Sequence, residues 1–127
     1  MSPDTQPVAA FRKNTSQLLY ILKGHTPIPE SDSKKWAEWY ERERKMCRVA
    51  FDEIGEAAIS TVFLGVDHNL SNENEQPHLF ETLIRGGQDD GTTERYATWE
   101  EAETGHAEWV KRIKVKTARQ KPANPAD

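Results

Sequence analysis

The chain has 127 residues and a formal net charge of −4, from 17 lysines and arginines against 21 aspartates and glutamates. Its length predicts one domain, and no stretch approaches the roughly 20 consecutive apolar residues that a membrane-spanning helix needs. Cys47 is the only cysteine, which excludes an intramolecular disulfide and a zinc framework built on cysteines. Residues 1–10 lack the apolar segment of a secretory signal, so we expect a soluble, cytoplasmic protein with no membrane partner.

The charge is unevenly distributed along the chain. From Lys111 onward six basic residues stand against one acidic residue, Asp127, which gives this end a balance of +5 and leaves −9 for residues 1–110. A basic end can contact nucleic acid, but a binding segment of that kind usually carries aromatic residues among its cations. Cations also suit the last turn of a helix, because its carbonyl end is negative. We therefore expect residues 115–127 to form a disordered basic tail, and we expect no nucleic-acid partner.

The first thirty residues favour irregular structure. Residues 1–17 show no hydrophobic periodicity and are predicted to be disordered. The apolar run at residues 18–22 is closed by Gly24 and then by Pro27 and Pro29, which exclude regular helix. This segment is predicted to pack across the core as an extended arm.

A helix is expected next, capped by Ser31 or Ser33. Trp36, Trp39 and Tyr40 follow at positions i, i+3 and i+4, which is the spacing of one buried helical face. Such a stripe of aromatic residues is far more typical of a protein core than of a ligand cage.

After this helix the hydrophobic pattern changes to a period of two. Cys47, Val49 and Phe51 alternate with more polar residues, which predicts a strand with these three side chains buried. A hairpin turn then leads into residues 57–66. These are nearly all apolar and β-branched, so they are predicted to form the central strand of a sheet.

Two more strands are predicted after a polar loop at residues 67–77. The third strand covers residues 78–85 and carries Phe80, Thr82 and Ile84 on one face. Its other face would carry Leu79, Glu81, Leu83 and Arg85. Residues 86–91 contain three glycines and predict a flexible turn, and residues 94–97 predict a short fourth strand.

The last element is predicted to be a long helix. Thr98 and Glu101 have the spacing of a capping box, in which side chains satisfy backbone N–H groups of the first turn. Gly105 inside the helix costs about 1 kcal/mol relative to alanine, so we expect a neighbouring group to pack closely against it. The apolar stripe of this helix is Trp99, Ala102, Trp109, Val110 and Ile113.

Together the elements predict a single α+β domain at residues 18–114. It would hold an antiparallel sheet of about four strands, with an N-terminal helix and a long C-terminal helix packed on it.

The sequence offers little support for catalysis. The four histidines share no metal-ligand spacing, and we expect neither a metal nor a cofactor. Asp67 and His68 could serve acid–base chemistry at a strand end, although a turn held by the Asp67 side chain is the more frequent use of such a pair. His106 is expected to be a packing residue with satisfied hydrogen bonds, and Cys47 an inert buried thiol. We therefore expect that the protein is not an enzyme.

Three arginines favour a binding function instead: Arg48, Arg85 and Arg95. They are predicted in strands of one sheet, and a guanidinium group binds phosphate or carboxylate well. Aromatic surface nearby would come from Phe80, Tyr96 and Trp99. In the alternative, the arginines pair across the sheet with acidic neighbours, namely Asp52, Glu81 and Glu94.

Four strings of the chain resemble a family of small proteins from bacteriophages and prophages. They are YILKGHTPIP at residues 20–29, ISTVFLGVDHN at 59–69, LFETLIRGG at 79–87 and ERYATWEEAETGH at 94–106. The resemblance covers about residues 18–113. This family is similar to the first type of anti-Thoeris phage proteins, which bind cyclic-ADP-ribose-type signals, and sometimes cyclic nucleotides, without cleaving them and so silence host immunity.

The resemblance implies a counter-defence protein of the host cytoplasm that sequesters a nucleotide-derived immune signal. The ligand is expected where the glycine loop after the third strand meets a neighbouring subunit. The site residues would be Arg48, Phe80, Arg85, Gly86, Gly87, Asp89, Asp90, Arg95 and Tyr96. Arg85 stands where the family pattern has an apolar residue, which would move charge into or away from the site. Four tryptophans in a chain that is only 35% apolar also favour a homo-oligomer that buries some of them.

Two other functions stay open. The −9 balance of residues 1–110 suits an anti-CRISPR-like phage inhibitor that binds a host defence protein with its acidic surface. Acidic and basic residues interleave between positions 38 and 52, however, which disfavours a dense acidic patch. A small enzyme that uses Asp67 and His68 is the third hypothesis.

Overall fold

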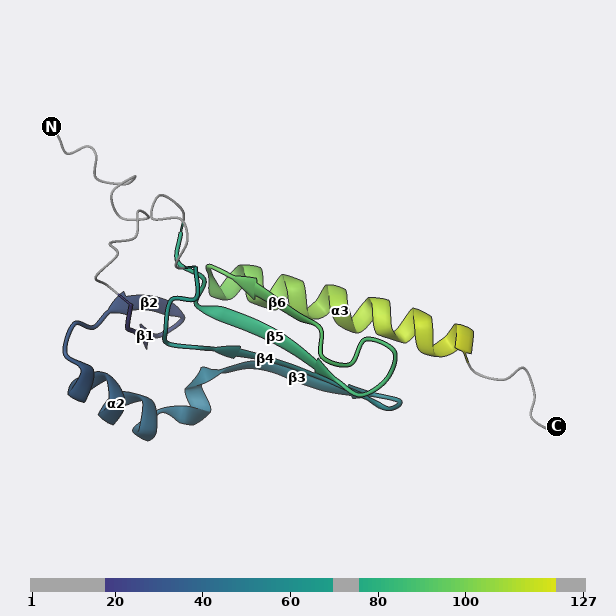
Figure 1. Ribbon diagram of the computed structural model, residues 1–127, viewed down its shortest axis with the longest axis horizontal. Coiled ribbons are helices and arrows are strands. Elements are labelled where there is room, and N and C mark those ends of the chain that lie inside the picture. Colours follow the sequence, from purple (N-terminus) through teal and green to yellow (C-terminus); the bar gives the residue numbers. More distant parts are fainter. Residues whose placement is uncertain (1–17, 70–75, 121–127) are drawn as a thin grey trace, which may run out of the picture.

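The computed structural model describes residues 18–69 and 76–120 (Figure 1). In chain order its elements are β1 (Tyr20–Lys23), β2 (Thr26–Pro29), α2 (Ser33–Arg42), the 3-10 helix η1 (Arg44–Cys47), β3 (Arg48–Ile54), β4 (Ala57–Phe63), β5 (Phe80–Arg85), β6 (Thr93–Tyr96) and α3 (Trp99–Gln120). The disorder expected for residues 1–17 and for the end of the tail at 121–127 lies outside the described residues. Residues 115–120, which we expected in that tail, continue α3 instead.

One antiparallel sheet and one long helix form the two layers of the fold. The strand order is β3-β4-β5-β6, and α3 runs along one face of this sheet and contacts all four strands (Figure 1). β1 and β2 form a second, two-stranded sheet beside α2. The expected α+β fold is therefore confirmed. No helix of the described residues is long and apolar enough to cross a membrane.

Both central strands alternate between buried and more exposed side chains, as predicted for residues 80–85. Leu79, predicted on the face opposite Phe80, instead precedes β5 and is buried in the core, because the strand begins only at Phe80. In β4 every second side chain from Ala57 to Phe63 is buried beneath α3, and in β5 the same holds for Phe80, Thr82 and Ile84. β4 pairs with β3 over residues 57–62 and with β5 over residues 58–63, as expected of a central strand. The pleat thus gives each strand a covered face and a face turned away from the helix.

The prediction for β3 was wrong in part. Cys47 is buried, but in η1 rather than in a strand, and Phe51 is 43% exposed instead of buried. The pairing with β4 shifts register between Arg48 and Ala50, which marks a β-bulge. One extra residue reverses the alternation of everything after it. Phe51 therefore points away from α3, and Asp52 points toward it.

The core between the sheet and α3 consists of two clusters. The first core cluster surrounds the start of α3 and contains Tyr20, Leu22, Cys47, Phe63, Leu79, Phe80, Tyr96, Trp99 and Ala102. The second core cluster lies under the later turns of α3 and contains Ala57, Ile59, Ile84, Trp109 and Ile113. Three polar residues, all buried, lie between the clusters: Thr61, Thr82 and His106.

The N-terminal arm forms a hairpin that closes the first core cluster. The Trp36 Nε1–H donates to the backbone oxygens of Tyr20 and Gly65 at 3.0 and 3.1 Å, so α2 ties the hairpin to the end of β4. At the hairpin turn, the His25 ring stacks on Trp99 with centroids 3.7 Å apart. The expected extended arm is thus a paired strand whose residues Tyr20 and Leu22 reach the core.

The start of α2 differs from the prediction in its cap. Asp32, rather than Ser31 or Ser33, accepts hydrogen bonds from the backbone N–H groups of Lys34 and Lys35. A carboxylate also suits the positive end of the helix dipole. The aromatic stripe of this helix is half-buried rather than buried.

The start of α3 matches the predicted capping box. The Glu101 N–H donates to Thr98 Oγ1 at 3.1 Å, and Glu101 Oε1 accepts from the Ala97 N–H. Gly105 lies directly against the Tyr96 ring, and a methyl group at this position would collide with it. The expected close neighbour of Gly105 is therefore Tyr96.

Candidate functional site

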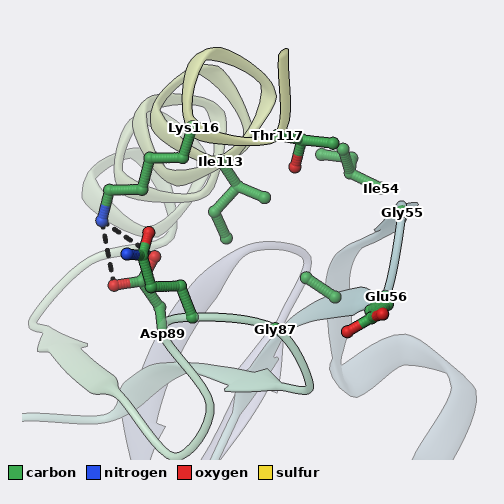
Figure 2. A pocket seen from close by; sticks show the side chains of 10 residues that line it. Ile54, Gly55, Glu56, Gly87, Asp89, Ile113, Lys116 and Thr117 are labelled. Atoms are coloured by element: carbon green, nitrogen blue, oxygen red, sulfur yellow. Dashed lines mark hydrogen bonds and ion pairs between the residues drawn. The ribbon is translucent and has the colours of Figure 1, made fainter. Parts of the chain in front are cut away.

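A pocket of about 300 Å³ opens where two loops of the sheet meet the later turns of α3 (Figure 2). The β3–β4 turn contributes residues 54–57, and the loop after β5 contributes residues 87–89. From α3 come Ile113, Lys116 and Thr117. This volume lies at the lower end of the range of about 300–1,000 Å³ that is typical of small-molecule sites.

Glycines hold the loop after β5 against the β3–β4 turn. Gly86 has φ +85°, and a side chain there would collide with the carbonyl oxygen of Glu56. Gly87 has φ +76°, and Asp90 Oδ1 accepts a hydrogen bond from the Gly86 N–H at 2.6 Å. Only glycine combines this backbone conformation with so close an approach. The predicted turn is therefore confirmed, and its glycines form one wall of the pocket.

The pocket has a charged wall and an apolar wall. Lys116 Nζ donates to both carboxylate oxygens of Asp89, at 3.0 and 2.9 Å, and both side chains are partly exposed. In Figure 2 this pair lies on one side of the pocket, while Ile54 and Thr117 lie on the other. Ile113 extends from α3 between them. A ligand here would meet a cation, carboxylate oxygens, a hydroxyl group and aliphatic carbon within one small volume.

The structure separates the predicted site residues into three groups. Gly87 and Asp89 line the pocket, and Gly86 and Asp90 support its loop. Phe80 and Tyr96 are buried beneath α3 in the first core cluster, at 0% and 7% exposure. The three arginines, Arg48, Arg85 and Arg95, are exposed on the face of the sheet that α3 does not cover. The loop residues therefore share one site, and the arginines belong to a different surface.

The alternative of arginine–carboxylate pairing holds for one of the three arginines. Arg95 Nε lies 3.1 Å from Glu81 Oε2, directly across the β5–β6 pairing. Arg48 instead lies over the Phe51 ring, 5.0 Å from its centroid. The other two carboxylates proposed as partners point to the α3 side, where Asp52 bonds His106 and Glu94 bonds Trp109.

Lys116 and Thr117 are pocket residues that the sequence prediction missed. Both lay in the segment expected to be a disordered tail. The signal that could have found them is the helical spacing from Trp109 through Ile113 to Lys116 and Thr117, at i, i+4, i+7 and i+8. Continued periodicity past residue 114 predicts a continued helix.

A series of hydrogen bonds crosses the core between the two clusters, and no sequence pattern predicted it. His106 bonds Asp52 Oδ2 through Nε2 at 2.8 Å and Thr61 Oγ1 through Nδ1 at 2.7 Å. Thr61 bonds Thr82 at 2.5 Å, and the Tyr96 hydroxyl donates to Thr82 at 3.0 Å. Burial raises the pKa of the Tyr96 hydroxyl, which therefore stays a donor at neutral pH.

This series of hydrogen bonds has the connectivity of an acid–histidine–hydroxyl triad, but the Thr61 hydroxyl group is enclosed in the core. Thr61 is 0% exposed, and only the Asp52 end reaches solvent. An attacking hydroxyl must reach a substrate carbonyl. These hydrogen bonds therefore satisfy polar groups inside the core, in agreement with the packing role expected for His106.

The Asp67–His68 segment is a turn held by its aspartate. Asp67 is 1% exposed, and its Oδ1 accepts from the backbone N–H groups of Asn69 and His78, at 2.8 and 3.0 Å. His68 is exposed. The turn interpretation is confirmed, because this carboxylate oxygen is bonded to the backbone rather than to His68.

Cys47 is an unreactive thiol at neutral pH. Burial, with a smaller contribution from Glu43, raises its pKa to about 11. The thiolate is the reactive form of cysteine, so the neutral group agrees with the predicted inert role. Across the part of the chain that the structure describes, no group of three or more histidine, cysteine, aspartate or glutamate side chains could hold a metal ion.

Comparison with protein-family models, with curated proteins and with solved structures gives no significant match. The pocket and the exposed faces of the sheet therefore have to be interpreted from their own chemistry.

Proposed function

We propose that the protein binds a small nucleotide-derived ligand in the pocket between the glycine loop and α3 and holds it without cleaving it. The observation that carries this proposal is the combination of Lys116, the carboxylates of Asp89 and Glu56, and aliphatic side chains around one opening of about 300 Å³. A nucleotide presents matching chemistry. Its phosphate attracts an ammonium group, its ribose hydroxyls donate to carboxylates, and its base packs on aliphatic carbon.

The pocket volume sets how much of the ligand is enclosed. About 300 Å³ accommodates one base with its ribose, so the remainder of a cyclic-ADP-ribose-type molecule would extend through the open mouth. Phosphate would replace Asp89 as the partner of Lys116, and Asp89 would then accept from ribose. The ion pair thus keeps both groups ordered until a ligand separates them.

In biological terms, the proposed function is phage counter-defence in the host cytoplasm. A protein that holds a nucleotide-derived immune signal lowers its free concentration, provided that the protein is present in excess over the signal. The resemblance of the four strings to phage proteins motivates this choice of ligand class.

The test is to incubate the full chain with cyclic ADP-ribose isomers, remove free ligand by desalting and denature the protein by heat. Mass spectrometry of the released fraction should recover intact ligand at close to one equivalent per chain. Recovery of an altered molecule would establish an enzyme instead. Absence of any retained ligand across the isomers would overturn the proposal.

Two lysines of α3 give a matched pair of variants. Lys116→Ala removes the cation of the pocket and should weaken binding about tenfold or more, because a charge-assisted contact with phosphate is lost. Lys114→Ala removes an exposed charge on the same helix and should leave affinity unchanged. Equal effects of the two substitutions would mean that α3 attracts anions only through its general charge.

A further inference from the structure

The face of the sheet turned away from α3 is composed of three rows of side chains, defined by the strand pairing. The upper row is Arg48, Val62, Glu81 and Arg95. The middle row is Phe51, Ser60, Leu83 and Thr93. The lower row is Glu53, Ala58 and Arg85. We call these eleven residues the open face. All of them are exposed or half-buried.

The middle of the open face is apolar enough to favour burial. Phe51 is 43% exposed, which places it among the exposed large apolar side chains of the described residues. It lies in the same row as Leu83, and Val62 and Ala58 flank that row on β4. Exposed apolar surface rimmed by charges is typical of protein–protein contact surfaces.

On β3 and on β5, the charged residues of the upper and lower rows have opposite signs. On β3, Arg48 is in the upper row and Glu53 in the lower row. On β5 the order is reversed, with Glu81 above and Arg85 below. Among the described residues, neither Glu53 nor Arg85 forms an ion pair within the chain. Both charges are therefore available to a partner.

Two copies of a sheet can pack face to face about a two-fold axis in two simple ways. With the axis parallel to the strands, β3 faces β6 of the second copy, so Arg48 meets Arg95, and Val62 meets Glu81. With the axis perpendicular to the strands, each strand faces its own copy and the upper row meets the lower row. Arg48 then meets Glu53, Glu81 meets Arg85, and Val62 meets Ala58.

We propose that a second copy of this chain docks on the open face in the perpendicular arrangement. Every charged contact on β3 and β5 then joins opposite signs, and the two-fold axis makes each contact twice. The middle row meets itself, so Phe51 and Leu83 form the apolar centre of the interface. The sheet twist rotates the two layers by about 30°, a displacement that the long arginine and glutamate side chains can span.

The size of the open face sets the strength of this dimer. Four strands about 4.8 Å apart and three rows about 6.8 Å apart cover roughly 400 Å² of flat area, about half of what each partner contributes to a standard interface. We therefore expect a dissociation constant in the micromolar range rather than the nanomolar range. This dimer leaves the pocket accessible, because the pocket opens at the α3 side of the sheet.

Light scattering over a concentration series tests the dimer. The full chain should approach twice its 14.5 kDa mass at about 100 μM and fall toward one chain on dilution. A mass of one chain at every concentration up to the millimolar range would overturn the proposal. In that case the open face would be left for a partner of another kind.

Charge reversal tests the arrangement of the two copies. Arg48→Glu and Glu53→Arg should each raise the dissociation constant about 100-fold, because two like-charge contacts replace two opposite-charge contacts. The double variant Arg48→Glu/Glu53→Arg should restore it to within about threefold of the original. Lys111→Glu, an exposed charge on α3, is the matched control and should have no effect. A dimer that all of these variants leave intact must use another surface, which would also overturn the proposal.

Chemical cross-linking gives an independent result that does not depend on reversing charges. Ser60 lies in the middle row, so Ser60→Cys places a thiol opposite its own copy. A short bifunctional maleimide should then link the two chains covalently, whereas the buried Cys47 should not react. Thr104→Cys, on the exposed side of α3, is the control and should give no linked dimer at the same concentration. Equal linking from both positions would contradict the proposed arrangement.

Discussion

The two core clusters under α3 differ in how completely they fill their space. In the first core cluster aromatic rings interlock, with Phe63 and Phe80 centroids 5.3 Å apart and Trp99 edge-on to Phe80. The hairpin and α2 close this end. Among the described residues the second core cluster has no such cover, and the pocket opens beside Ile113. α3 thus covers a filled core at one end of the sheet and borders an open pocket at the other end.

The difference has a physical origin in the elements that precede the sheet. Residues 18–47 fold over one end of the sheet, so their tryptophans and tyrosines add a third layer there. At the other end, within the described part of the chain, the helix meets two short loops, whose glycines cannot fill space. A complete core gives stability, and an incomplete one leaves a pocket.

The largest expected effect comes from truncating each cluster in turn. Phe63→Ala should lower the free energy of unfolding by about 4 kcal/mol, because Phe63 is 0% exposed and packed on all sides. Ile113→Ala should cost about 2–3 kcal/mol, since one side of Ile113 already faces the pocket. Urea denaturation measures both. If Phe63→Ala does not fold, Phe63→Leu should still cost about 1 kcal/mol. An equal loss at the two positions would contradict the difference in packing.

An intermediate effect is expected from the hydrogen-bond chain that separates the clusters. His106→Ala should cost about 2–3 kcal/mol, because it opens a cavity and removes the partner of Thr61. Asp52→Ala should cost less than about 1 kcal/mol, since the Asp52 side chain is 51% exposed and water can replace it. The same urea experiment compares them. A larger loss for Asp52→Ala would mean that the Asp52 carboxylate, rather than the His106 imidazole, contributes most of the stability of these hydrogen bonds.

A further and smaller effect than truncation of either cluster is a pH dependence that arises in the first core cluster. The unfolded Cys47 thiol loses its proton near pH 9, whereas the folded one keeps it to about pH 11. Unfolding therefore releases a proton between these values, and stability falls as the pH rises from 9 to 11. We expect a loss on the order of 1–2 kcal/mol. Cys47→Ala should remove this part of the pH dependence, and an unchanged curve would assign it to the buried tyrosines.

Periodicity predicted most of the fold. The alternation in residues 80–85, the strand within residues 57–66, the capping box at Thr98 and the close contact at Gly105 each follow from short-range rules, and the structure agrees with all of them. The same rules failed at β3, because one inserted residue changes the face of Phe51 without changing the composition of the segment. A bulge is decided by the neighbouring strand, which a local pattern does not include.

The candidate site could be predicted only in part. The glycine loop was recognised from its composition, but its partners on α3 were not, since they are separated from it by 27 residues in the case of Asp89 and Lys116. Arg48, Arg85 and Arg95 do share one sheet, as expected. Their separation from the loop follows from the pleat, which turns them to the opposite face.

By itself, therefore, the sequence determined most of the secondary structure, the α+β fold class and the chemically inert state of Cys47, because these depend on spacing and on apolar content. The tertiary structure alone decided which residues meet. It joined Asp52, His106 and Thr61 across the core and placed Lys116 beside the glycine loop. It also put residues of opposite charge in the upper and lower rows of β3 and β5. These contacts connect residues far apart in the chain, and their geometry is fixed only when the sheet and α3 pack together.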